Sequence, residues 1–103
     1  MSGTGARDRW WLASLGRTVV WARLRVREAG TAEVLDSDGN TLAYDSEDTA
    51  CAMLMDAQFV ALDGLDEEDA LERGFSLDEI TPPAGASDEE LRPRMVQKLG
   101  GSA

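Results

Sequence analysis

Residues 20–44, VWARLRVREAGTAEVLDSDGNTLAY, decide the fold, because apolar and polar side chains alternate along them and two glycine turns divide them. Successive side chains of a strand point to opposite faces of a sheet, so a two-residue period indicates a half-buried strand. The inward residues of the first strand would be Val20, Ala22, Leu24 and Val26. The outward residues would be Trp21, Arg23, Arg25 and Arg27.

The first turn is predicted from the pairing that it imposes. A three-residue loop that ends at Gly30, with this glycine in the left-handed region, places Leu24 opposite Val34 and Arg25 opposite Glu33. A two-residue turn would instead place an apolar side chain opposite a carboxylate. A one-residue slip moves every side chain of a strand to the other face, so the apolar pairs favour the longer loop.

The second turn is predicted in the same way. A three-residue loop that ends at Gly39 places Val34 opposite Leu42, and Ala32 opposite Tyr44, so that all four share one face. The sequence therefore predicts a three-stranded antiparallel meander with one apolar face.

The second turn also has the spacing of a calcium loop. Asp36, Asp38, Asn40 and Glu47 occupy positions one, three, five and twelve, as the ligands of an EF-hand do. The EF-hand needs glycine at position six and a helix on each side, whereas Thr41 stands at position six and the residues before the loop have a strand pattern. We expect no metal ion and no cofactor.

One main helix is expected after the third strand. Asp45 or Ser46 would cap its first turn, and Gly64 would end it. Apolar residues recur at helical spacing on two flanks of this segment, which predicts that its methionines pack in the core. These residues are Ala50, Met53, Leu54, Ala57 and Ala61 on one flank, and Cys51, Met55, Phe59 and Leu62 on the other.

Short acidic helices are expected next. LDEEDALERG, residues 65–74, indicates a helix capped by Asp66 and closed by Gly74, and SLDEI, residues 76–80, contains a capping box from Ser76 to Glu79. Two prolines at 82–83 and the following AGAS indicate a linker. Whether a helix forms within residues 88–99 is left open.

These elements predict an α+β fold: a three-stranded antiparallel meander with one main helix packed on one face, followed by short acidic helices. We assign residues 1–17 to a partly mobile N-terminal segment, in which WWLASLG is either helix or strand. Residues 18–81 would form the core domain. Residues 82–103 would form a linker, a possible short helix and a flexible tail.

Composition limits the possible functions. The chain has no histidine, which removes the commonest general base and imidazole metal ligand, so we predict no catalytic residues and no enzyme activity. The single cysteine, Cys51, is expected to be a buried thiol. No apolar run approaches the ~20 residues of a membrane span, and no clear export signal is present, so we expect a cytoplasmic protein without a membrane partner.

Charge is distributed unevenly along the chain, whose net charge is −10. Residues 1–28 carry six arginines and two acidic residues, a net +4, and the rest carries four basic and eighteen acidic residues, a net −14. Twelve carboxylates lie between positions 45 and 79, with one arginine among them. Clustered charge of one sign accelerates association with an oppositely charged protein and selects against other partners.

We therefore favour a non-enzymatic, small acidic protein-binding module, such as an inhibitor, an immunity-like protein or an adaptor, that binds a basic protein. Its partner-binding residues would be Asp63, Asp66, Glu67, Glu68, Asp69 and Glu72.

The alternative is nucleic-acid binding through the arginine-bearing sheet face, since the major groove of DNA admits β-structure. Its residues would be Trp21, Arg23, Arg25 and Arg27. In topology, the expected sheet and helix resemble the AP2-type and integrase amino-terminal DNA-binding domains, and that resemblance would imply such a role. The acidic net charge opposes it, because phosphate binding needs local positive charge.

Overall fold

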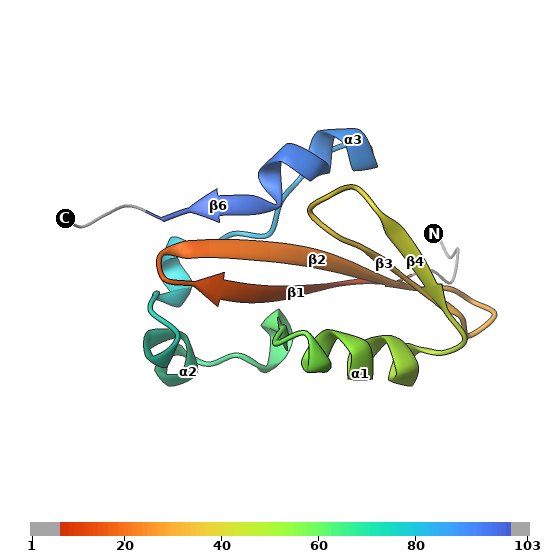
Figure 1. Ribbon diagram of the computed structural model, residues 1–103, viewed down its shortest axis with the longest axis horizontal. Coiled ribbons are helices and arrows are strands. Elements are labelled where there is room, and N and C mark those ends of the chain that lie inside the picture. Colours follow the sequence, from red (N-terminus) through yellow and green to blue (C-terminus); the bar gives the residue numbers. More distant parts are fainter. Residues whose placement is uncertain (1–6, 100–103) are drawn as a thin grey trace.

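The computed structural model describes residues 7–99 and shows an antiparallel sheet with helices on both sides (Figure 1). In chain order, the elements are β1 (Arg7–Leu15), β2 (Thr18–Val26), β3 (Ala32–Leu35), β4 (Thr41–Tyr44), α1 (Glu47–Asp56), β5 (Val60–Ala61), the 3-10 turn η1 (Leu62–Gly64), α2 (Glu67–Glu72), the 3-10 turn η2 (Leu77–Glu79), α3 (Asp88–Leu91), the 3-10 turn η3 (Arg92–Arg94) and β6 (Val96–Lys98). The expected α+β class is confirmed. None of these helices is long and apolar enough to cross a membrane.

The sheet has six strands, so the expected three-stranded sheet is wrong. The order is β4-β3-β2-β1-β5, and β6 also pairs with β2. β1 pairs with the whole of β2, while β3 pairs with residues 23–26 and β6 with residues 18–20 of the same strand. Because β1 occupies one edge of β2, β3 and β6 share its other edge end to end.

The paired segments reach beyond the range 18–81 that we expected to form the core. β1 lies in the segment expected to be partly mobile, and β6 lies in the segment expected to contain the linker and tail. The predicted mobility of residues 1–6 and of the tail after residue 99 concerns positions outside the described part of the chain.

Both hairpin registers between β2 and β4 are as predicted. Leu24 pairs with Val34, and Val34 pairs with Leu42. Gly30 and Gly39 have φ values of +94° and +89°, in the left-handed region that side chains with a Cβ rarely adopt. An added Cβ at Gly39 would lie 2.9 Å from Cδ of the flexible Arg92 side chain, which can move aside, so the backbone conformation is what requires glycine there.

The first core lies between the sheet and α1. It contains Ala22, Leu24 and Val26 of β2 and the inward residues of β3, packed with Ala50 and Leu54 of α1, as expected. Val20, which was also predicted to face inward, is half-buried and lies outside this cluster. Leu42 lies on the predicted face, but the edge position of β4 leaves it 52% exposed. One face of the sheet is thus only partly covered.

The second core covers the opposite face, where we expected an exposed surface. The chain passes from α2 around the turn between β1 and β2, α3 then lies on the other side of the sheet, and β6 joins the edge of β2 (Figure 1). Trp21 is packed with Phe75, Leu91 and Met95 in this cluster, and all four are buried. Burial of this apolar surface, at about 25 cal/mol per Å², stabilises the C-terminal segment on the sheet.

Helix α1 ends at Asp56, eight residues before the predicted end at Gly64. Gln58 adopts φ +74° and donates its N–H to the Met55 carbonyl at 3.0 Å, and the Phe59 N–H reaches the Leu54 carbonyl at 2.9 Å. This is the Schellman pattern, with glutamine where glycine is usual. The chain then turns back and pairs β5 with β1, which explains why the apolar period continues past the end of the helix.

Candidate functional site

The six carboxylates that we predicted to bind a partner are all exposed. Asp63 lies in η1, Asp66 is the N-cap of α2, and the other four lie within α2. The predicted limits of this helix are confirmed, because Asp66 accepts the Asp69 N–H at 2.8 Å and Gly74, at φ +100°, follows its last turn. The local sequence therefore fixes where these carboxylates lie.

Three of these carboxylates have structural contacts. Asp66 forms the cap, Glu67 accepts the Ser76 hydroxyl at 2.9 Å and the Leu77 N–H at 3.2 Å, and Asp63 lies 3.8 Å from Nε of Arg9. Glu67 thereby ties α2 to η2. Its carboxylate is less available to a partner than the sequence suggested.

The other three carboxylates are Glu68, Asp69 and Glu72. Within residues 7–99, none of them forms an ion pair, and all three face solvent. Adjacent like charges that are not neutralised raise the local negative potential. This part of α2 is therefore a candidate for an electrostatic contact.

An apolar groove lies beside this acidic helix face. It has a volume of about 230 Å³. Its wall is formed by the end of α1, strand β5, the residues just before α2 and one side of α2. The apolar lining residues are Trp11, Met55, Phe59, Val60, Ala61 and Leu65, and Asp69 and Arg73 contribute the polar part. Sequence reasoning missed this groove, because it placed Met55 in the core together with Phe59, and only Phe59 packs there.

The position of the groove follows from the early end of α1. The left-handed turn at Gln58 brings Phe59 back over the sheet, and Met55, in the last turn, is left 60% exposed. No local pattern marks this ending, since glutamine is not a usual residue at a left-handed cap. The strand-like triplet Phe59-Val60-Ala61 after the helix is the one sequence signal that could have indicated it.

The arginine-bearing face of β2 differs from the surface that we predicted for nucleic acid. Trp21 is 0% exposed and meets Trp10 edge to face, with ring centroids 6.0 Å apart. Arg23 is 6% exposed, under the segment that leads into α3. The expectation that Trp21 and Arg23 lie on an open surface is wrong, because this face forms the second core.

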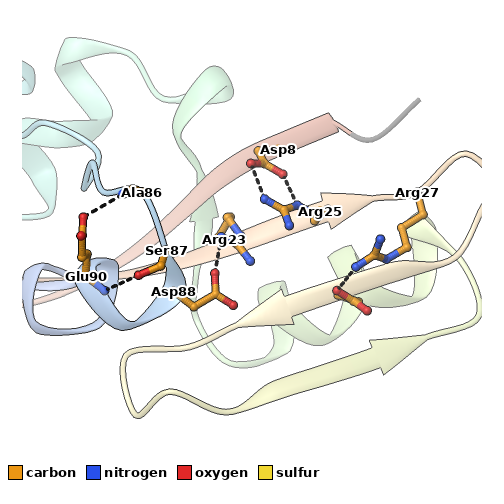
Figure 2. Close-up of polar contacts among 9 residues, drawn as sticks. Asp8, Arg23, Arg25, Arg27, Ala86, Ser87, Asp88 and Glu90 are labelled. Atoms are coloured by element: carbon orange, nitrogen blue, oxygen red, sulfur yellow. Dashed lines mark hydrogen bonds and ion pairs between the residues drawn. The ribbon is translucent and has the colours of Figure 1, made fainter. Parts of the chain in front are cut away.

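Each of the three outward arginines of β2 has a carboxylate partner (Figure 2). Nη1 of Arg23 lies 2.9 Å from Asp88, and Arg25 donates to both carboxylate oxygens of Asp8, at 2.7 and 3.1 Å. The third pair joins Nη2 of Arg27 to Glu33, at 2.7 Å. Glu33 was predicted opposite Arg25 and does pair with it across the strands, although its side chain bonds to Arg27.

These contacts change the acid–base behaviour of the paired groups. Hydrogen bonds from Arg25 hold the pKa of the Asp8 carboxyl below its ordinary value, although partial burial acts in the opposite direction. The hydrogen bond from Arg27 lowers the pKa of Glu33 in the same way. Both carboxylates stay ionised in neutral solution, so the neighbouring positive charges are balanced.

A polar cavity of about 400 Å³ lies between β2 and the segment before α3. Arg23, Arg25, Asp8 and Asp88 all line it, together with Trp10 and residues 83–87. Two cations face two anions, so the walls carry no net positive charge for a phosphate. Of the four residues predicted to bind nucleic acid, Arg23 and Arg25 line this cavity, and both are paired with carboxylates.

Two other predictions concern reactive groups. Cys51, in α1, is partly buried. Desolvation, and to a smaller extent the charge of Glu47, raises the pKa of its thiol, so little thiolate forms at neutral pH.

Asp36 accepts the N–H groups of Asp38 and Asn40, each at 3.0 Å, and so closes the hairpin turn that resembled a calcium loop. Across residues 7–99, no three acidic or cysteine side chains are grouped to hold a metal ion.

Comparison with known proteins adds no functional assignment. No family model, no curated protein and no solved structure matches this chain.

Proposed function

We propose that this protein is a non-enzymatic binding module that holds a basic protein partner against α2. The proposal rests on a difference between the acidic side chains of α2 and the arginine side chains of β2. Glu68, Asp69 and Glu72 face solvent without an ion pair in the described part of the chain, whereas the outward arginines of β2 are each paired with a carboxylate. These three carboxylates are close together on one short helix, so α2 presents a local negative charge to solvent.

A small rigid helix with unpaired carboxylates suits this role. The Schellman turn after α2 and the bonds of Glu67 to η2 fix the helix on the protein, so a partner does not need to order it. Electrostatic complementarity of this kind raises the association rate and gives specificity more than it adds affinity. Binding should therefore weaken as salt is added.

Charge reversal tests the proposal. The immobilised protein is exposed to an extract of the cells that produce it, and retained proteins are identified by mass spectrometry. The triple variant Glu68→Lys, Asp69→Lys, Glu72→Lys should lose the basic proteins that the wild type retains. A matched control, Glu28→Lys, Asp38→Lys, Asp78→Lys, makes the same change in net charge at exposed sites on other elements and should retain them.

Two results would reject the proposal. One is equal loss of partners in both triple variants, which would indicate a general charge effect. The other is retention by the α2 variant. Glu67 is left unchanged because its replacement would also break the contacts to Ser76 and Leu77.

Nucleic-acid binding has less support as the alternative. Arg23 and Arg25 would have to release Asp88 and Asp8 before they could contact a phosphate. Titration with duplex and single-stranded DNA at low salt distinguishes the two proposals, and the variant Arg23→Glu, Arg25→Glu would abolish binding in the alternative case.

A further inference from the structure

We propose that the groove between α1 and α2 receives one apolar side chain of the basic partner, while the carboxylates along its rim bind the cations that flank that side chain. This inference rests on the proposed function and adds what the partner must look like. The occupant is a lysine- or arginine-rich segment with a single large aliphatic or aromatic residue.

The groove supplies the apolar part of such a contact. Phe59, Val60 and Leu65 are half-buried in its wall, and Met55 is exposed at its mouth. Its volume of about 230 Å³ is below the ~300 Å³ at which pockets for drug-sized ligands begin, so one side chain is a better match than a cofactor. A methionine at the mouth lets the wall adapt to the shape of that side chain.

The rim supplies the charged part. Asp69 lines the groove, and Glu72 lies on the same face of α2, because residues three positions apart on a helix are neighbours. Arg73 also lines the groove, which leaves one cation against the carboxylates of Asp69 and Glu72 on this side of α2. An apolar centre with a polar, charged rim is how interfaces combine affinity with specificity.

Other occupants fit less well. A second copy of the chain would bring together two molecules that each carry a net charge of −10, and these repel each other. Positions 1–6 and 100–103 are made mostly of small residues, and although Met1 is apolar, they contain no lysine or arginine to bind the carboxylates beside the groove. Charge complementarity therefore favours a basic partner.

Two short synthetic peptides with the same number of lysines test the inference. One has a central leucine, and the other has glutamine at that position. The wild-type protein should bind the leucine peptide about tenfold more tightly, because only leucine loses apolar surface to the groove. With the methionine methyl groups labelled with ¹³C, the Met55 signal should shift on binding of the leucine peptide.

The molecule contains its own control for this experiment. Met53 is exposed to a similar extent, 50% against 60% for Met55, but lines a different hollow near β4, so its methyl signal should stay in place. Met55→Gln should abolish the preference for leucine, and Met53→Gln should preserve it. Both side chains are exposed, so neither change is expected to unfold the protein.

The outcomes separate the two proposals. A preference for leucine that depends on Met55 supports both. Equal binding of the two peptides overturns the groove as an anchor site and leaves the electrostatic surface in place. Binding of neither peptide at low salt contradicts the proposed function as well as the groove.

Discussion

Nη1 of Arg23, in the middle of β2, lies 2.9 Å from Oδ1 of Asp88, the first residue of α3. The arginine side chain is almost fully buried, while about half of the aspartate side chain is exposed. The ion pair thus connects the sheet to the segment that covers its second face. It also determines how much positive charge that face can offer to a ligand.

Removal of this carboxylate should destabilise the protein. Asp88→Asn leaves the buried guanidinium without its counter-charge and should lower the free energy of unfolding by about 1–2 kcal/mol, less than for a fully buried pair because Asp88 is half exposed. Urea denaturation measures this change. Glu33→Gln removes the partner of the more exposed Arg27 and serves as the control, with an expected change of less than ~1 kcal/mol. Equal effects of the two changes would contradict the role assigned to burial.

Replacement of the glutamine that ends α1 should stabilise the protein. Gln58→Gly removes the energetic cost of a left-handed conformation in a residue with a Cβ. Glycine also gives the unfolded chain more conformational freedom, which offsets part of this gain. The net effect should be a rise of about 0.5–1 kcal/mol in the free energy of unfolding. Thermal unfolding followed by circular dichroism measures the gain. Gln58→Ala keeps the Cβ and should give no such gain. A lower melting temperature for the glycine variant would show that the turn is not left-handed.

The C-terminal segment should unfold together with the sheet. Met95 is fully buried in the second core, so Met95→Ala should cost about 2–4 kcal/mol through lost burial and an unfilled cavity. Its exposed neighbour Val96 provides the control, because Val96→Ala should change stability by less than ~1 kcal/mol. Guanidinium denaturation of both variants gives the comparison. Wild-type stability in the Met95 variant would mean that the segment after residue 82 is only a tail.

The contribution of the Asp8–Arg25 pair to the free energy of unfolding should depend on pH. The pKa of Asp8 is lowered in the folded protein, so its contribution is complete above the unfolded pKa of about 3.9 and is lost as the pH falls through the lower folded value. The difference in unfolding free energy between the wild type and Asp8→Asn should be constant from pH 7 to about pH 5 and should disappear in stronger acid. Denaturation curves across this range measure it. A difference that persists or grows in acid would contradict the hydrogen-bonded pair.

Local turn chemistry explains which parts of the fold could be predicted. The registers of β2, β3 and β4 follow from a two-residue period and from glycines at Gly30 and Gly39, so neighbouring residues contain the necessary information. The limits of α2 follow from Asp66 and Gly74 for the same reason. Both features were predicted correctly.

Non-local pairing explains what was missed. The middle of β1, residues 10–12, is apolar on both faces because each face meets a different core, so no alternation of apolar and polar residues distinguishes a strand from a helix there. β5 and β6 are two and three residues long and form only because β1 and β2 offer free edges. The groove beside α2 was missed because it joins residues from α1, β5 and α2, and no single segment describes it.

The position of the binding surface is the central claim, and backbone amide chemical shifts test it most directly. The ¹⁵N-labelled protein is titrated with the leucine-containing lysine peptide at low salt. We expect the largest changes in residues 55–73, from the last turn of α1 through α2, and little change at Arg23, Arg25 and residues 83–88. Changes centred on those arginines and that segment, with α2 unaffected, would contradict the account.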